Sequence, residues 1–458
     1  MAVEQTKTDK QALFSTVSVP RALATMAIPT IISQLIALIY NIADTWFIGQ
    51  TDNPYMVAAA SLVATVFLMT AGVSNLFGVG GGSLVVRLLG SNREEEARKV
   101  ASLSLVMAGA ASVAFSALCL MFMNPLLRLL GASDNTIGYA RQYLLIVVII
   151  GGLPTVMAST MSAMLRNIGY SKEAGFGLGL GGVLNVILDP IFMFVLMPDG
   201  MEVVGAALAT MLSNCISCTF FILTYRRVSR DSILALPQRI ETVEKDSMRS
   251  IFSVGVPAAM GLLLYDLTNI VINALSASHG DLELAAIGIV LKVERLPQNI
   301  GIGICLGMMP LVAYNYAAKN YDRMYAFFKA SRIAGVAVAA CSLVLYRTFA
   351  AQFIQAFISD SQTVVFGTAF LKIRCFAPAF MFLSFHIVHF MQAVNRGKAS
   401  LVLPLIRQLG LNIPLLFLLN HLFGMTGIVW TQTIADAINV IISCVVFRKI
   451  VTKIRQEV

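Results

Sequence analysis

Long apolar runs, separated by short polar segments, occupy most of the chain. A helix that crosses a bilayer needs about 20 mostly apolar residues at a rise of 1.5 Å per residue. Each run of that length is predicted to be one spanning helix, so the expected fold is an all-α polytopic membrane protein. The twelve predicted transmembrane helices are 21–48, 56–89, 98–123, 139–165, 174–196, 203–225, 248–277, 284–317, 328–356, 366–393, 399–419 and 426–447.

The composition agrees with a membrane protein. Of the 458 residues, 57% are hydrophobic and only 12% are charged, which excludes an ordinary soluble domain. The first run is too long for the core of a signal peptide and lacks a small-residue cleavage pattern. Residues 1–20 are therefore expected to remain as a short tail.

The net charge of +9 is unevenly distributed. Besides the two tails, Lys and Arg gather in alternate loops, which include 87–99, 166–172, 226–249, 319–332 and 396–407. No Lys or Arg occurs in the turns 50–55, 197–202, 278–283 and 420–424. Because basic loops mark the cytoplasmic side of a membrane, both termini are predicted to be cytoplasmic. The basicity is thus a signal of orientation, and no nucleic-acid partner is expected.

The two halves of the chain align with a nearly constant offset. Pro29 matches Pro257 and Asn92 matches Asn320, each pair 228 residues apart. Because each half holds six runs, the repeat is parallel, and two pseudo-symmetric six-helix lobes are predicted. The predicted domains are an N-terminal tail 1–20, an N-lobe 21–225, a cytoplasmic linker 226–247, a C-lobe 248–447 and a C-terminal tail 448–458.

Two similar lobes indicate a transporter. A pair of such bundles can rock about a central site and expose it to each side of the membrane in turn. A membrane enzyme needs no such duplication, and the sequence shows no nucleophile with its base. Some channels also arise from repeats, so duplication alone does not prove transport.

Two carboxylates lie inside apolar runs of the N-lobe. A charge near the bilayer midplane costs about 2.5–3.5 kcal/mol, so each carboxylate needs compensation. Tyr40 precedes Asp44 by four residues and Asn185 precedes Asp189 by four, which places each pair on one helix face. Pro190 also leaves the carbonyl four residues before it without a donor.

A carboxylate, an amide and a free carbonyl together suit a proton or a small hard cation. Two plainer interpretations stay open. Asp44 lies near the outer end of its run, where it could cap the helix or meet headgroup water. Asp189 could be a structural residue beside a proline kink.

Charged residues also interrupt the C-lobe helices. Lys292, Glu294 and Arg295 cannot all face one direction, so Glu294 and Arg295 are expected to face the cavity or to pair with neighbours. Asp266 is the expected ion-pair partner of Lys292 or Arg295, and a direct coupling role is the alternative. The candidate residues of a C-lobe cavity are Asp266, Asn269, Asn273, Lys292, Glu294 and Arg295.

Neither a metal nor a nucleotide site is expected. His386 and His389 share a helix face, but no further ligands lie nearby, so both are interpreted as cavity-lining or packing residues. The glycine-rich segment 78–82 lacks the strand and the Gly-Lys-Ser/Thr of a phosphate loop. No cofactor is predicted.

Several segments of the chain form a family pattern in a fixed order. They are IPTIISQLIALIYNIADTWFIGQ, GVGGGSLVVRLLGSNREEEARK, LRNIGYSKEA, LNVILDPIFMF, VGAALATMLSN and, in the second half, GICLGMMPLVAYNYAAKNYDRM. This pattern resembles the MATE (multidrug and toxic compound extrusion) family over nearly the whole chain. It looks closest to the bacterial multidrug-efflux branch that includes the DNA-damage-inducible relatives.

The resemblance implies a V-shaped pair of lobes in the bacterial inner membrane, and export of amphipathic, often cationic, drugs in exchange for H⁺ or Na⁺. Small-molecule drugs and membrane lipid are the implied partners, with no obligate protein partner. Asp266 lies near an acidic position of some branches. The implied cation-coupling residues are Asp44, Asn185, Asp189 and Thr210, with Tyr40 beside them.

A flippase for lipid-linked oligosaccharides, which has a related fold, is the alternative function. Such a protein is expected to place several basic side chains in its central cavity, where they would bind a pyrophosphate lipid. The sequence offers only Lys292, Arg295, Lys372 and Arg374 as candidates. An antiporter is therefore favoured over a flippase.

Overall fold

The computed structural model describes residues 12–51, 53–229, 232–236 and 244–456. Parts of both predicted tails and of the predicted linker therefore lie outside the described residues. The first half of the chain forms the N-lobe. Its helices are α2 (Val19–Gly49), α3 (Pro54–Gly90), α4 (Glu94–Met121), α5 (Met123–Leu129), α6 (Ile137–Leu144), the π-helix η1 (Leu145–Ile150), α7 (Gly152–Asn167), α8 (Ser171–Ile191), the π-helix η2 (Phe192–Leu196) and α9 (Glu202–Val228).

The second half repeats this order of long and short helices and forms the C-lobe. In both lobes a short helix, α5 or α13, follows the third long helix. The C-lobe helices are α10 (Lys245–Ala277), α11 (Asp281–Ala317), α12 (Tyr321–Thr348), α13 (Ala350–Gln355), α14 (Ser361–Arg374), α15 (Ala377–Ala393), α16 (Gly397–Leu405), the π-helix η3 (Ile406–Asn412) and α17 (Ile413–Gln456).

Many of these helices are long and apolar enough to cross a membrane. Among the described residues, eight single helices meet that requirement, or ten if two pairs bent by 45° each count as one span. The bends lie before α7 and before α15, at equivalent places in the two lobes. The chain is thus an all-α, multi-pass membrane protein, as the sequence predicted.

The last two predicted spans lie on either side of Gly424, where α17 is interrupted by a non-helical residue (φ 58°, ψ −141°). Arg407 contacts Asp436, and Asn412 contacts Gln432, so the chain reverses direction between these pairs. Only glycine adopts such a positive φ without steric cost. The segments before and after Gly424 therefore run antiparallel.

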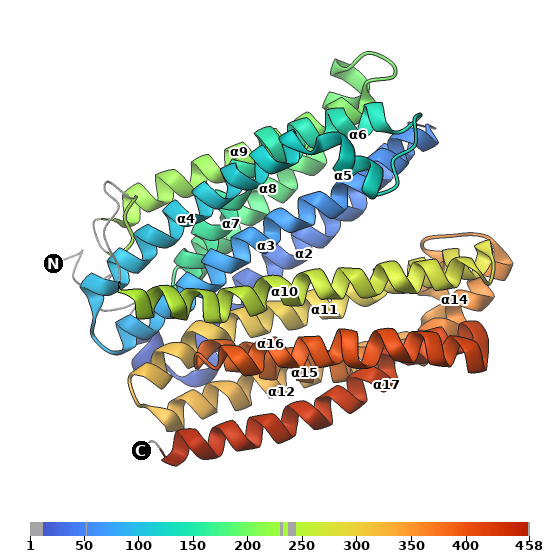
Figure 1. Ribbon diagram of the computed structural model, residues 1–458. Helices are drawn as coiled ribbons and strands as arrows, with labels where there is room; N and C mark the ends of the chain where they lie inside the picture. The colour runs from blue at the N-terminus through green and yellow to red at the C-terminus, as the bar shows by residue number, and fades with distance from the viewer. Residues whose placement is uncertain (1–11, 52, 230–231, 237–243, 457–458) are drawn as a thin grey trace.

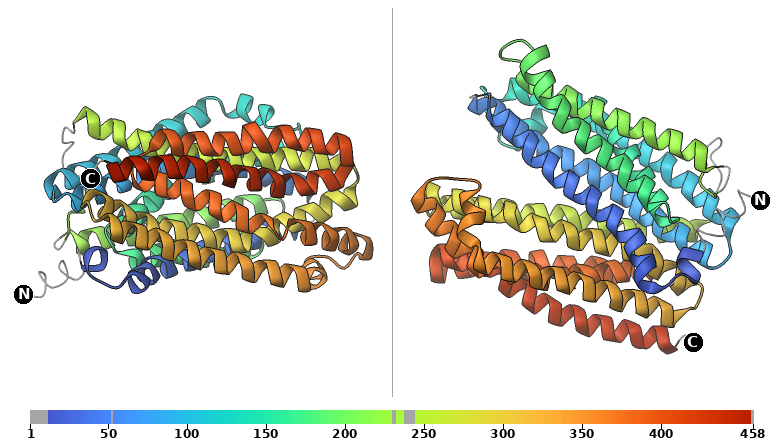
Figure 2. Two further views of the ribbon diagram at one scale, coloured as in Figure 1. Left: turned by 90° about the horizontal axis from the view of Figure 1, so that it is seen from below. Right: turned by 180° about the vertical axis from the view of Figure 1, so that it is seen from behind.

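The two lobes converge at one end of the molecule. Figure 1 shows α2–α9 in one layer and α10–α17 in the other, and the layers come together at the end that holds both chain termini. The view from behind in Figure 2 shows the same convergence and the divergence at the opposite end. The structure is therefore V-shaped, with its closed end at the termini.

Close backbone packing joins the lobes at the closed end. A Cβ atom on Gly80 of α3 would lie only 2.9 Å from Gly255 Cα of α10. Similarly, a Cβ on Gly307 of α11 would lie 2.6 Å from Ala27 Cα of α2. Gly80 and Gly307 are 227 residues apart and Ala27 and Gly255 are 228 apart, so the two contacts are equivalent under the repeat.

Polar contacts reinforce this closure. Arg87 of α3 donates to Ser250 Oγ of α10 at 2.8 Å. Ser83 Oγ, also on α3, donates to the carbonyl of Gln392 at 3.1 Å. Both hydrogen bonds join opposite lobes, so they must break if the lobes separate at this end.

In both lobes, a residue with a left-handed backbone conformation follows the second long helix. Asn92 (φ 60°) follows α3 and Lys319 (φ 58°) follows α11, at an offset of 227. The predicted match of Asn92 with Asn320 is therefore wrong by one residue. Asn320 is the N-cap of α12, and the equivalent N-cap of α4 is Arg93. The repeat itself is present in the backbone.

Candidate functional site

The predicted cation-coupling residues come together inside the N-lobe. Asp189 is fully buried (0% exposed) on α8, and Asn185 lies one turn before it on the same face. The Asn185 amide nitrogen, Nδ2, lies 3.2 Å from Asp189 Oδ1 and 3.2 Å from Thr210 Oγ1 on α9. Asp44, on α2, is within electrostatic range of Asp189. Three helices thus contribute to one polar cluster.

Three oxygen atoms in this polar cluster are buried and have no hydrogen-bond partner among the described residues: Asp44 Oδ1, Asn185 Oδ1 and Asp189 Oδ2. Buried polar atoms are almost always paired, so unpaired acceptors indicate that a donor or cation belongs there. Carboxylate and amide oxygens are the ligands that hard cations prefer, and a carboxylate can also take a proton. The residues present therefore fit H⁺ or Na⁺.

Glycine on α8 allows this polar cluster to assemble. A Cβ on Gly182 would lie 2.8 Å from Ile36 and 3.1 Å from the Tyr40 ring, so only glycine lets α2 approach this closely. Tyr40 is therefore held beside α8, one turn before Asp44. Asp44 lies inside α2, which ends at Gly49, so it does not cap that helix.

Tyr143 is a member of the site that the sequence reasoning missed. It is 6% exposed on α6, lies next to Thr210, and is within electrostatic range of Asp44, Asp189 and Tyr40. Its phenol could donate a hydrogen bond to one of the unpaired oxygens after a small movement. No local signal distinguishes this tyrosine from the apolar residues around it.

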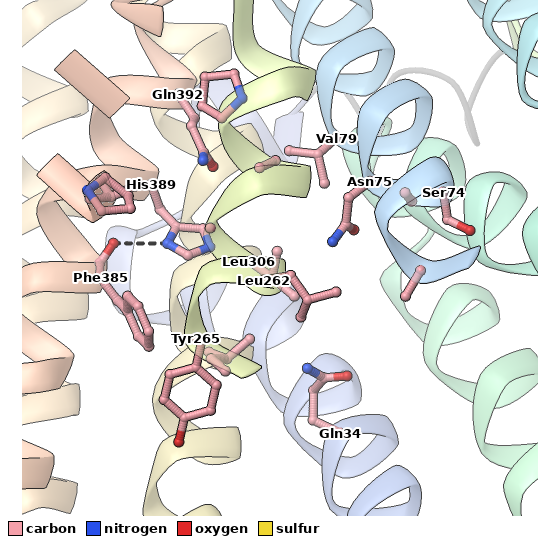
Figure 3. Close-up of a pocket in the computed structure, with 18 of the residues that line it drawn as sticks. Gln34, Ser74, Asn75, Val79, Leu262, Tyr265, Leu306, Phe385, His389 and Gln392 are labelled. Carbon is pink, nitrogen blue, oxygen red and sulfur yellow. Dashed lines mark hydrogen bonds between the residues drawn. The ribbon is translucent and has the colours of Figure 1, made fainter. Parts of the chain in front are cut away.

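A second site, separate from the first, lies between the lobes. A cavity of about 410 Å³ opens there, a size suited to a drug-like molecule. Figure 3 shows Gln34, Ser74 and Asn75 of the N-lobe facing Tyr265, His389 and Gln392 of the C-lobe. The remaining lining residues are mostly apolar and include Val79, Leu178, Leu262, Ile302, Leu306, Phe385 and Val388.

None of the six predicted C-lobe cavity residues lines this cavity. Glu294 instead forms a buried bidentate ion pair with Arg374, at 2.9 and 2.8 Å. Of the two expectations for Glu294, a place in the cavity wall was wrong, whereas pairing with another residue was right, with a partner 80 residues away on α14. Lys292, Arg295 and Asn273 are exposed in the structure.

Asp266 and Asn269 are half-buried on α10 but do not reach the cavity. One Asp266 oxygen, Oδ2, is buried without a hydrogen bond, and Arg295 is within electrostatic range of this carboxylate. No ion pair of Asp266 with Lys292 occurs among the described residues. The expected partnership with Arg295 is therefore a long-range attraction and not a contact.

The basic residues that do line the cavity are Arg166, Arg407 and His389. Arg166 and Arg407 were predicted to lie in basic loops, but both lie in helices. Arg166 is in the last turn of α7, and Arg407 is buried in η3, where it pairs with Asp436 at 2.5 and 3.1 Å. Arg166 directly follows the run 139–165, so its position resembled that of a loop residue. Arg407 lies inside the predicted span 399–419, near its start, and had been grouped with the basic residues that precede that span.

The two histidines of α15 have different surroundings. His386 is fully buried, stacks on Phe328 at 4.3 Å and hydrogen-bonds Ser331 Oγ at 2.8 Å. His389 lies in the cavity wall with Nδ1 2.8 Å from the carbonyl of Phe385. One histidine packs and the other lines the cavity. Among the described residues, no group of three or more His, Cys, Asp or Glu could hold a metal ion.

The architecture is that of a two-lobe membrane transporter, with a cavity between the lobes and a separate cluster of buried polar residues inside the N-lobe. The MatE family model matches the chain twice, over residues 29–191 and 257–418, once in each lobe. Together these matches cover more than half of the sequence. The protein belongs to the MatE family, which confirms the prediction made from its motifs.

Individual relatives agree with this assignment. The chain is 30% identical to "Multidrug export protein MepA" of Staphylococcus haemolyticus over 432 residues, which are 94% of each protein. A multidrug resistance MATE family transporter in its outward-facing conformation superimposes with a TM-score of 0.91, at 21% identity and over 97% of this chain and 98% of that one. A MATE protein in complex with MaD3S gives 0.91 at 22% identity, over 98% and 99%. These structures establish the fold.

Proposed function

We propose that the protein is a secondary active multidrug exporter, which moves amphipathic organic compounds outward in exchange for inward-moving H⁺ or Na⁺. The observation that carries this proposal is the set of three buried, unpaired oxygens on Asp44, Asn185 and Asp189. They form a cation site in one lobe, apart from the cavity that would hold the exported compound. The name of the Staphylococcus haemolyticus relative, a multidrug export protein, supports the same function.

The membrane potential makes such an exchange productive. One positive charge that moves inward supplies about 2.3 kcal/mol per 100 mV. Since about 1.4 kcal/mol corresponds to a tenfold ratio, one cation could sustain roughly a fortyfold gradient of a neutral compound. Without coupling, the cavity would only let the compound equilibrate.

We place the protein in the bacterial cytoplasmic membrane with both termini in the cytoplasm. The support is the concentration of Lys and Arg in the tails and alternate loops, even without Arg166 and Arg407. In that orientation the closed end of the V faces the cytoplasm, so the structure is in an outward-open state. The hydrogen bonds of Arg87 and Ser83 across the lobes would then form the inner gate.

The flippase alternative finds less support. Its sequence candidates were Lys292, Arg295, Lys372 and Arg374, and none of them lines the cavity. Arg374 is buried against Glu294, and the other three are exposed.

The test is transport by the purified full-length protein in proteoliposomes. The vesicles are loaded with a fluorescent dye, and dye release is followed under an imposed H⁺ or Na⁺ gradient. Gradient-driven release is expected for the wild type, and Asp189→Asn is expected to abolish it because one anionic ligand of the cation is lost. Asp199→Asn, which alters an exposed loop carboxylate, is the matched control.

The ion whose gradient drives release identifies the coupling cation. Gradient-driven release by Asp189→Asn at the wild-type rate, with equal protein per vesicle, would refute the assignment of the cation site.

A further inference from the structure

Basic side chains, but no acidic ones, are present among the described residues that line the interlobe cavity. Among the described lining residues there is no Asp or Glu, whereas Arg166, Arg407 and His389 contribute basic groups. A cationic compound in this cavity would find no carboxylate in the wall to compensate its charge. Because a desolvated charge needs a partner, the lining favours a ligand of the opposite sign.

Arg407 is already compensated. Its guanidinium makes a bidentate pair with Asp436, which lies behind the wall and also accepts a hydrogen bond from Gln432 at 2.7 Å. The guanidinium carbon stands 4.9 Å from the centre of the Phe385 ring. Arg407 therefore shapes the wall, and its charge is not available to a ligand.

Arg166 is different, because its charge has no partner. It is half-buried at the end of α7, and within the described part of the chain its guanidinium makes neither a hydrogen bond nor an ion pair. A guanidinium presents five N–H donors in a planar arrangement that matches a carboxylate or a sulfonate. An anionic ligand would supply the missing acceptors.

His389 approaches the same region from the opposite lobe, within electrostatic range of Arg166. The Phe385 carbonyl can only accept a hydrogen bond, so His389 Nδ1 must carry the hydrogen. The other ring nitrogen, Nε2, makes no hydrogen bond to any described residue. It donates a hydrogen bond to an anionic ligand when the ring is protonated, and a bound anion favours that protonated form. Figure 3 shows this ring beside the Gln392 amide, with Asn75 across the cavity.

We propose that the cavity selects amphipathic organic anions, with Arg166 and His389 forming the subsite for a carboxylate or sulfonate and the apolar wall holding the rest of the molecule. The inference rests on the proposed function, in which this cavity holds the exported compound. It departs from the cationic drugs that the family resemblance implied. Export of an anion is also aided by an inside-negative potential, whereas export of a cation is opposed by it.

The experiment measures equilibrium binding of two dyes to the purified full-length protein in detergent, by fluorescence anisotropy. Fluorescein and rhodamine 6G share a xanthene ring system but carry opposite charges at neutral pH. We expect the wild type to bind fluorescein more tightly than rhodamine 6G. Arg166→Gln is expected to weaken fluorescein binding by about ten- to hundredfold, the usual effect of a lost hydrogen bond to a charged group, and to leave rhodamine 6G unchanged.

Two further variants separate recognition from folding. Arg166→Lys keeps the charge and is expected to retain most of the fluorescein affinity, and Arg98→Gln, at an exposed position on α4, is expected to behave as the wild type. If Arg166→Gln is not monodisperse, His389→Gln tests the same subsite from the other lobe, with weaker fluorescein binding expected.

Tighter binding of rhodamine 6G than of fluorescein by the wild type, or fluorescein binding unaffected by both Arg166→Gln and His389→Gln, would overturn the proposal. The two dyes also distinguish failure of the anion-subsite proposal from failure of the proposed antiport function. Ion-driven export of rhodamine 6G without fluorescein binding keeps the antiporter and refutes the anion subsite. Arg166-dependent fluorescein binding without ion-driven export of either dye keeps the anion subsite and refutes the antiporter.

Discussion

The buried ion pair between Glu294 and Arg374 gives a prediction about stability. The two side chains are 1% and 2% exposed, and both guanidinium contacts are shorter than 3 Å. Glu294→Gln would remove the negative charge and leave Arg374 charged in an apolar interior. Breaking one side of a buried pair costs about 3–5 kcal/mol, so we expect a loss of that size.

A double variant tests the cause of that loss. Glu294→Leu combined with Arg374→Met removes both desolvated charges and fills similar volume. We expect this double variant to be more stable than Glu294→Gln, because no unpaired charge remains. The assay is unfolding of the purified protein in mixed micelles by titration with SDS, followed by circular dichroism.

An exposed pair provides the control. Arg128 and Asp134 form an ion pair that is open to solvent, so Arg128→Gln is expected to change the unfolding curve little. A loss below about 1 kcal/mol for Glu294→Gln, the range of solvent-exposed pairs, would refute the reasoning that this pair is desolvated. So would a double variant that is less stable than the single one.

Two further predictions concern the lobe contact and a helix cap. Gly255→Val is expected to abolish dye export without loss of monodispersity, because a Cβ there would lie 2.0 Å from Leu76 O. Gly288→Val is the control, since a Cβ at Gly288 would have no atom within 4 Å. Export at the wild-type rate by Gly255→Val would contradict the close contact between the lobes. Hydrogen bonds from the Thr363 N–H and hydroxyl lower the pKa of the Asp360 carboxyl from its usual 3.8. The cap therefore stabilises α14 fully above pH 3.8 and is lost as pH falls through the lower folded-state pKa. Asp360→Ala should lower the melting temperature at neutral pH but not at about pH 2, and an equal decrease at both would count against this cap.

The sequence was sufficient to predict the helices and their repeat, because apolar length and the spacing of charged loops are local properties. It also located Asp44, Asn185 and Asp189, since a carboxylate inside an apolar run has few explanations. What it could not give was the rotation of each helix about its axis. Lipid and lobe interior are both apolar, so a spanning helix has no polar stripe to mark its inner face.

The residues that were missed or misassigned are explained by this lack of information on helix rotation. Tyr143 joins the polar residues around Asp189 only because α6 packs beside α9, and nothing within α6 indicates this. Arg166 was assigned to a loop because it stands near the end of a run, although its side chain reaches the cavity. For Glu294, pairing was one of two expectations, but the sequence did not identify Arg374 as the partner because it lies in a distant segment. Each error concerns contacts between helices, which one-dimensional spacing does not specify.

The paired glycine contacts at the closed end have a consequence for the symmetry of the lobe interface. Gly80 meets Gly255 and Gly307 meets Ala27, so each lobe presents the same two patches, and each patch meets the other one on the opposite lobe. A self-complementary surface of this kind is what defines the interface of a two-fold symmetric homodimer. The two lobes therefore pack with the geometry of a two-fold symmetric dimer, although both belong to one chain.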